Sequence, residues 1–169
     1  MKLVEPIKID ENTFNSFIKE FTLSGEDLVP YSLNQKGKEF KKYIETLNDE
    51  AVGKGIPENW VPASTYFLID DENNIYGAVN IRHRLTENLK IIGGHVGFGI
   101  KPSVRHKGYG TKILELALSK CKDMGITKVL VTCNKENIGS MKVIQNNGGK
   151  LDSEADIDEE LIQRYWIVL

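Results

Sequence analysis

A short stretch in the second half of the chain combines basic residues with two glycines, a composition that suits a bound phosphate. It runs Lys101-Pro102-Ser103-Val104-Arg105-His106-Lys107-Gly108-Tyr109-Gly110-Thr111. Glycines 108 and 110 let backbone N–H groups approach an anion without an intervening Cβ. A helix beginning there would add its free amides and the positive end of its dipole. We therefore expect an anion-binding loop. The alternative is a basic turn whose glycines serve only tight packing.

Two common phosphate-binding loops are excluded by spacing. A P-loop needs lysine and a hydroxyl residue directly after its last glycine, whereas Gly108 is followed by Tyr109-Gly110-Thr111. A dinucleotide-binding fingerprint needs three glycines after the first strand of the fold. The present loop has two glycines and follows a late strand.

The elements that must position this loop follow from the apolar spacing. Helices are expected over residues 12–21, 38–47, 110–124 and 138–147, and strands over 4–9, 65–69, 75–81, 95–100, 128–133, 150–154 and 162–168. The strand, helix and strand over 95–133 form a right-handed crossover, so these strands should be parallel neighbours or near neighbours. The order predicts one α/β domain over residues 1–169 with a mixed sheet. The less regular residues 23–62 should form a lid or wall.

Bulk composition limits the classes of function. The chain has 169 residues, 40% of them hydrophobic and 27% charged, and a net charge of -2. This charge provides no general attraction to nucleic acid or to a membrane surface. Cys121 and Cys133 lack the spacing of a metal site or a disulfide framework, and no signal peptide or membrane span is evident. We expect a cytoplasmic protein without a metal.

The loop and the segment after it resemble the GNAT acetyltransferases. The family signature [Arg/Gln]-x-x-Gly-x-[Gly/Ala] is matched by residues 105–110. Its next block appears as a strand over 129–133, then Asn137-Ile138-Gly139-Ser140, and a helix closing at Gly148. Residues 64–169 resemble the family in order, and residues 1–63 are compatible with its first strand and two helices. The resemblance implies a twisted, mostly antiparallel mixed sheet of about six or seven strands with about four helices.

The resemblance also implies a function. Such enzymes transfer the acetyl group of acetyl-CoA to a primary amine, by direct attack in a ternary complex. The acceptor is the amine of a small molecule or an exposed amine of a protein, and homodimers are common. Two other classes stay open: a non-catalytic acyl-CoA-binding sensor module, and a nucleotide-binding regulator, which the lack of a P-loop lysine disfavours.

Cofactor-binding residues are implied by the same resemblance. The backbone of Phe98, Gly99 and Ile100 would pair with the pantetheine arm like an added strand. The loop residues Arg105, His106, Lys107, Gly108, Tyr109, Gly110 and Thr111 would hold the pyrophosphate. Asn137 and Ser140 would contact the pantetheine or its phosphate side. The alternatives are a helix cap for Asn137 and a small packing residue for Ser140.

The residues that would handle protons match the family less well. The tyrosine that often protonates the leaving thiolate is replaced by Ile144. His95 is a candidate base, although relatives place the base at the positions of Gly94 and Val96, which have the opposite strand parity. A bulge at Gly93-Gly94 would change that facing. The alternative for His95 is a hydrogen-bonded structural histidine.

A basic turn after the third expected strand is the candidate for acceptor binding. Arg82 or Arg84 would grip a carboxylate of the acceptor, since a guanidinium binds a carboxylate through two hydrogen bonds. The alternative is an exposed basic turn. Tyr31 and Trp60 are candidates for the wall of the same pocket, with plain packing as their alternative.

Overall fold

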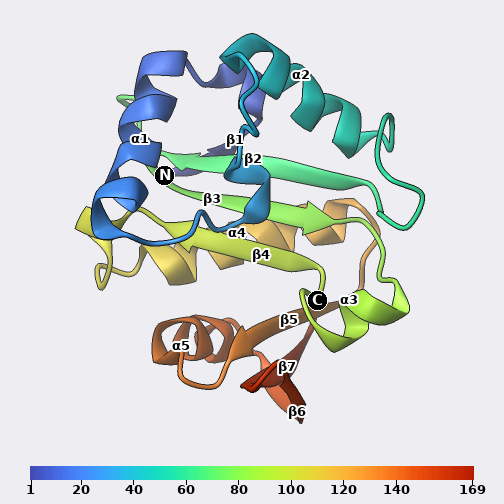
Figure 1. Ribbon diagram of the computed structural model, residues 1–169. Helices are drawn as coiled ribbons and strands as arrows, with labels where there is room; N and C mark the ends of the chain where they lie inside the picture. Colours follow the sequence, from blue (N-terminus) through green and yellow to red (C-terminus); the bar gives the residue numbers. More distant parts are fainter.

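The computed structural model describes residues 1–169 and contains two antiparallel sheets with five α-helices (Figure 1). One sheet has the order β1 (Lys2–Val4), β2 (Ala63–Ile69), β3 (Ile75–Arg82), β4 (Val96–Ile100). The other has the order β5 (Lys128–Asn134), β7 (Glu160–Val168), β6 (Lys150–Ile157). The helices are α1 (Glu11–Ser24), α2 (Phe40–Ala51), α3 (Glu87–Ile91), α4 (Tyr109–Asp123) and α5 (Ile138–Asn146). The fold class expected from the sequence is confirmed.

The four-stranded sheet is covered on both faces, because successive side chains of its strands point to opposite sides. Leu68 and Val79 pack against the apolar side of α4 in one buried cluster. Phe67 and Ala78 belong to a second cluster, which α1 and α2 supply with aromatic rings. The sheet therefore separates a face covered by α4 from a face covered by α1 and α2.

The two sheets meet at one point, at the start of β4 and within β5. The N–H of His95 donates to the carbonyl of Leu130 (2.7 Å), and the N–H of Leu130 donates to Nδ1 of His95 (2.9 Å). Gly94 makes this approach possible, since a Cβ there would collide with the Leu130 carbonyl. From this point β4 and β5 diverge toward the start of α4 and toward α5 (Figure 1). The strands form no ladder with each other.

Two local predictions were wrong. The first strand ends at Val4, because the chain turns through a 3-10 helix at Pro6–Lys8 and does not continue as a strand to residue 9. The polar segment expected as a loop contains α3, which begins where the Thr86 side chain accepts from the N–H of Leu89 (3.2 Å). Both elements are too short for apolar periodicity to reveal. None of the helices has the length and apolar character to cross a membrane.

Candidate active site

The loop expected to bind an anion leads from the end of β4 into α4. A 3-10 turn at Pro102–Val104 is followed by Gly108, whose φ of 87° is in the left-handed region. The first backbone bond of the helix runs from the N–H of Lys112 to the carbonyl of Gly108 (3.1 Å), and no side chain caps the helix. Consequently no amide from His106 to Thr111 has a hydrogen-bond acceptor within the chain. This row of free donors at a helix N-terminus suits a pyrophosphate.

The two glycines of the loop serve different purposes. A Cβ at Gly108 would meet no atom within 4 Å, so glycine is needed there for the backbone angle. A Cβ at Gly110 would lie 2.8 Å from Cγ2 of Val143, so that glycine lets α5 pack closely on the start of α4.

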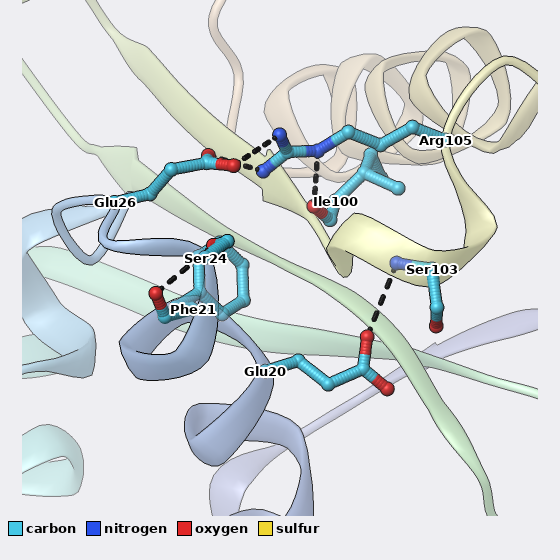
Figure 2. A network of polar contacts seen from close by, with 7 residues as sticks. All are labelled: Glu20, Phe21, Ser24, Glu26, Ile100, Ser103 and Arg105. Atoms are coloured by element: carbon cyan, nitrogen blue, oxygen red, sulfur yellow. Dashed lines mark hydrogen bonds and ion pairs between the residues drawn. The ribbon is translucent and has the colours of Figure 1, made fainter.

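Two acidic side chains, one in the last turns of α1 and one just after the helix, form hydrogen bonds and ion pairs with the loop (Figure 2). The guanidinium of Arg105 donates to both carboxylate oxygens of Glu26 (2.8 and 2.7 Å), and its Nε donates to the carbonyl of Ile100 (3.0 Å). Glu20 pairs with Nζ of Lys101 (3.0 Å) and accepts from the N–H of Ser103 (3.1 Å). We call these four side chains, Glu20, Glu26, Lys101 and Arg105, the strap.

The strap changes what Arg105 can do. Its hydrogen bonds hold the pKa of Glu26 below the ordinary value. For Glu20, burial alone would raise the pKa, but the bonds from Ser103 and Lys101 outweigh it and the pKa is lowered. The guanidinium is thus engaged with Glu26 and the Ile100 carbonyl, and direct contact of Arg105 with a cofactor stays a prediction. Nothing in the sequence near the loop signals Glu20 and Glu26, which lie about 80 residues earlier in the chain.

β4 offers an edge to which an extended ligand can bind. The N–H of Arg82 donates to the carbonyl of His95, and the N–H of Lys101 donates to the carbonyl of Tyr76. Every second residue between them, Gly97 and Gly99, likewise turns its backbone N–H and carbonyl toward β3. Phe98 and Ile100 therefore direct their polar backbone groups to the other edge, facing β5. The Ile100 carbonyl is already bonded to Arg105. Phe98 and the N–H of Ile100 are left to pair with a ligand.

Gly99 acts differently from its neighbours. Its backbone groups belong to the ladder with β3, and a Cβ there would collide with the carbonyl oxygen of Val29. Its contribution is therefore to let the segment after α1 lie directly on β4.

The residues expected on the α5 side are arranged as follows. Asn137 caps α5, with its Oδ1 accepting from the N–H of Ser140 (2.9 Å). This is the capping role that the sequence left open, and contact with a cofactor through the remaining amide group stays a prediction. Ile144 is fully buried in the core and is tightly packed beside Gly149, so this position holds no acid.

His95 is buried at the point where the sheets join. Because its Nδ1 accepts from Leu130, the neutral ring carries its proton on Nε2. Burial lowers its pKa, and the positive charge of Arg82 lowers it further. In this arrangement neither ring nitrogen has a free lone pair, and the ring links the two strands. A role as base stays a prediction.

The two arginines expected to bind an acceptor lie in different surroundings. The guanidinium of Arg82 donates from one nitrogen to the carbonyls of Gly93 (2.9 Å) and Gly94 (3.1 Å), holding the turn before β4. Burial lowers its pKa. Arg84 is exposed and does not line the cavity described next.

A cavity of about 380 Å³ lies on the face of the sheet that α1 and α2 cover, at the end of β3. Its wall comes from five separate parts of the chain: residues 30–38, α2, residues 56–63, β3 and α3. Tyr31 and Trp60, expected at such a wall, both line it, as does Arg82. Pro30 of the wall also lies against Gly97 of β4. The cavity and α4 are thus on opposite faces of one sheet.

Comparisons with known proteins agree with this geometry. Residues 18–150 match the family model described as "Acetyltransferase (GNAT) domain". No curated protein matches the sequence. Among solved structures, the chain is similar to a ribosomal-protein-S5-alanine acetyltransferase from Vibrio fischeri, with a TM-score of 0.70 and 14% identity over 99% of this chain and 91% of that one.

Two further structures are similar over nearly the whole chain. A variant of a spermidine N-acetyltransferase from Vibrio cholerae gives a TM-score of 0.65 and 15% identity, covering 99% of this chain and 95% of that one. A ribosomal L7/L12 alpha-N-protein acetyltransferase in complex with coenzyme A gives a TM-score of 0.66 and 12% identity, covering 99% of this chain and 93% of that one. These likenesses show the fold. The family model spans most of the chain, and the chain therefore belongs to the GNAT acetyltransferases.

Proposed function

We propose that this acetyltransferase uses acetyl-CoA and passes the acetyl group to a primary amine by direct attack in a ternary complex. The observation that carries the proposal is the row of unpaired amides from His106 to Thr111 at the start of α4. The free edge of β4 precedes this row in the chain, separated from it by the turn at Pro102–Val104. Free donors and a free strand edge suit the two ends of one ligand, its pyrophosphate and its amide-containing arm. The family membership supports the same donor.

In this proposal, each part of the cofactor site has a defined task. The amides of the loop hold the pyrophosphate, with the exposed Lys107 adding charge from solvent. Phe98 and the N–H of Ile100 pair with the pantetheine amides, and Asn137 and Ser140 lie on its other side. Arg105 acts through the strap by fixing the loop. Acetyl-CoA supplies the activated acetyl group.

The acceptor reaches the acetyl group from the other face of the sheet, through the cavity at the end of β3. The similar structures are named as acetyltransferases of spermidine, of ribosomal-protein-S5-alanine and of the alpha-N position of ribosomal L7/L12, which supports a primary amine as acceptor. Since Ile144 offers no proton, the thiolate of coenzyme A would be protonated by solvent. Arg84 stays a candidate for contacts at the entrance, while Arg82 fixes the turn beside it.

Two remaining expectations belong to the proposal. We infer a cytoplasmic location, supported by two free thiols buried in the core, Cys121 and Cys133, each with a pKa raised by burial to about 11. A homodimer is also proposed, on the resemblance alone, and light scattering of the purified protein tests it.

The first test is calorimetric titration with acetyl-CoA, comparing the wild-type protein with Gly108→Asp and Gly125→Asp. Both glycines have positive φ, at opposite ends of α4, and both have open space around a Cβ. The backbone strain is therefore matched, and only Gly108→Asp puts a negative charge among the loop amides. We expect binding to weaken by about a hundredfold or more in Gly108→Asp and to persist in Gly125→Asp. Equal binding in all three proteins would contradict the proposed site.

Turnover separates the enzyme from a sensor module, the alternative that the buried Ile144 favours. Release of free thiol is followed with acetyl-CoA and a panel of amines. Multiple turnovers with one amine establish the transferase. Tight binding of acetyl-CoA with no turnover for any amine supports the sensor.

A further inference from the structure

The charges in the cavity carry information about the acceptor. Three basic side chains line it, those of Lys36, Lys38 and Arg82, against one carboxylate, that of Glu50. The local balance is positive, although the chain as a whole has a net charge of -2. A polycation would therefore enter against repulsion, and a ligand with a negative group would be attracted.

Glu50 is the one acidic group among the residues that line the cavity, and its carboxylate makes no hydrogen bond or ion pair. Its side chain is half-buried at the end of α2. The nearby Lys54 bonds the adjacent Asp49 (3.2 Å) and not Glu50. Burial raises its pKa, while Lys36 and Lys38 lower it in part. A carboxylate in a partly enclosed site without a partner is unfavourable unless a ligand supplies one. An ammonium group is the natural partner.

The two lysines are fixed by the cavity wall itself. The ammonium of Lys36 lies over the rings of Tyr31 (4.9 Å to the centroid) and Trp60 (5.6 Å). These two rings would otherwise suit a cationic ligand, but the protein's own lysine occupies them. The ammonium of Lys38 donates to Oγ1 of Thr46 (2.8 Å). Both charges are thus held at the wall, where an anionic group of a ligand can reach them.

We infer that the acceptor is a small zwitterionic amine, bound with its amino group at Glu50 and its carboxylate at Lys36 and Lys38. This inference rests on the proposed function, since it identifies the substrate class of that same site. The volume of about 380 Å³ is at the lower end of the range for ligand pockets, and five chain segments enclose it. The size suits a free amino acid or a similar aminocarboxylate better than a protein segment.

The test compares free amino acids with matched amines that lack the carboxylate, and also with a polyamine and with peptides. Thiol release is measured with lysine, lysinamide and cadaverine, with methionine and methioninamide, with spermidine, and with tripeptides that begin with alanine, serine or methionine. We expect kcat/KM for a free amino acid to exceed that of its amide by about tenfold or more, as for a lost charge-assisted hydrogen bond. Preference for the amides, for spermidine or for the tripeptides overturns the inference.

Substitutions in the cavity test which residues bind the carboxylate of the ligand and which bind its amino group. In the double variant Lys36→Met/Lys38→Met, KM for the amino acid should rise about tenfold while kinetics with the amide change little. Glu50→Gln should weaken both substrates. Lys54→Met is the control, since Lys54 lies outside the cavity and pairs only with Asp49. An equal effect of the lysine substitutions on acid and amide overturns the assignment.

Failure of the inference can be distinguished from failure of the proposed function. Calorimetric binding of acetyl-CoA is measured on each of these proteins. If acetyl-CoA does not bind the wild type, the proposed function fails. If it binds and other amines are acetylated but no free amino acid is, the inference alone is wrong. If it binds and no amine of the panel is acetylated, the proposed transferase fails as well.

Discussion

At the scale of single residues, His95 illustrates how a side chain placed beside an active site can have a structural task. Nδ1 of its ring accepts a hydrogen bond from the backbone N–H of Leu130, in the neighbouring sheet. The backbone N–H of His95 donates to the carbonyl of the same residue. Between them these two bonds satisfy both backbone groups of one residue on β5. A histidine used in this way must be neutral at Nδ1, and protonation would break the link.

This predicts a loss of stability in mild acid. The pKa of His95 in the folded protein is lowered by burial, so the unfolded chain binds the proton more readily. Its contribution is present above the unfolded pKa and declines as the pH falls below about 6.5. The free energy of unfolding, measured in urea from about pH 7.5 to about pH 5.5, should therefore fall less steeply in His95→Gln than in wild type.

A matched control is His106→Gln, because His106 is exposed on the loop between β4 and α4. Its pH slope should match that of the wild type. The same slope in all three proteins would show that His95 is not the titrating group.

The residues of the cavity mark the limit of what the sequence could reveal. The loop at 101–111 could be found because its residues are contiguous and their chemistry needs only local backbone. Lys36, Glu50 and Arg82 come from three distant segments, and no spacing rule connects them. Of the residues that line the cavity, Tyr31, Trp60 and Arg82 were expected there. The contact of the two rings with Lys36 depends on tertiary packing, which the sequence does not reveal.

At the scale of elements, the strap joins α1 and the segment after it to the loop that begins α4. Both of its ion pairs are partly exposed, so each contributes modestly to global stability. Their effect is local. They fix the distance between the loop and the chain that continues into the cavity wall at residues 30–38.

We expect Glu26→Gln and Arg105→Lys each to weaken acetyl-CoA binding by roughly three- to tenfold, since a paired guanidinium is not replaced by an amine. The double variant should lose no more affinity for acetyl-CoA than the single variant with the larger loss, because both substitutions remove the same ion pair. Additive losses would indicate instead that Arg105 contacts the cofactor directly. Asp49→Asn, which removes an exposed ion pair with Lys54, serves as control and should leave binding unchanged.

Long elements with strong periodicity were predictable, and short ones were not. α4 is expected over 110–124 and observed at Tyr109–Asp123, and the boundaries of β5 agree to within one residue. The apolar spacing predicts such segments well because many of their residues fit the same helical or extended pattern. β1 and α3 are three and five residues long, and they form because neighbouring elements fix them, which sequence spacing does not report.

At the scale of the whole molecule, the two sheets are joined where Gly94 lies against the backbone of β5. Gly94 has a φ of 59°, and a Cβ would collide with the carbonyl of Leu130. Gly94→Ala should therefore lower the free energy of unfolding by roughly 3 kcal/mol or more. Gly125→Ala has a similar positive φ but open space, and should cost only about 1–2 kcal/mol.

Urea unfolding of these two variants, followed by far-UV and near-UV circular dichroism, checks the expectation. Equal losses would mean that the backbone angle alone matters and that the close approach of the sheets contributes nothing. A larger loss in Gly94→Ala would establish the junction as a main support of the fold.

Under the proposed function, the strap also has a thermodynamic consequence for the two substrates. It connects the donor loop to the chain that walls the acceptor cavity, so any ordering of one by its ligand alters the cost of ordering the other. By linkage, the factor by which coenzyme A changes the affinity for the amine must equal the factor by which the amine changes the affinity for coenzyme A. Glu26→Gln, which removes the ion pair with Arg105, should bring both of these affinity factors closer to 1. Each substrate should then bind as though the other were absent.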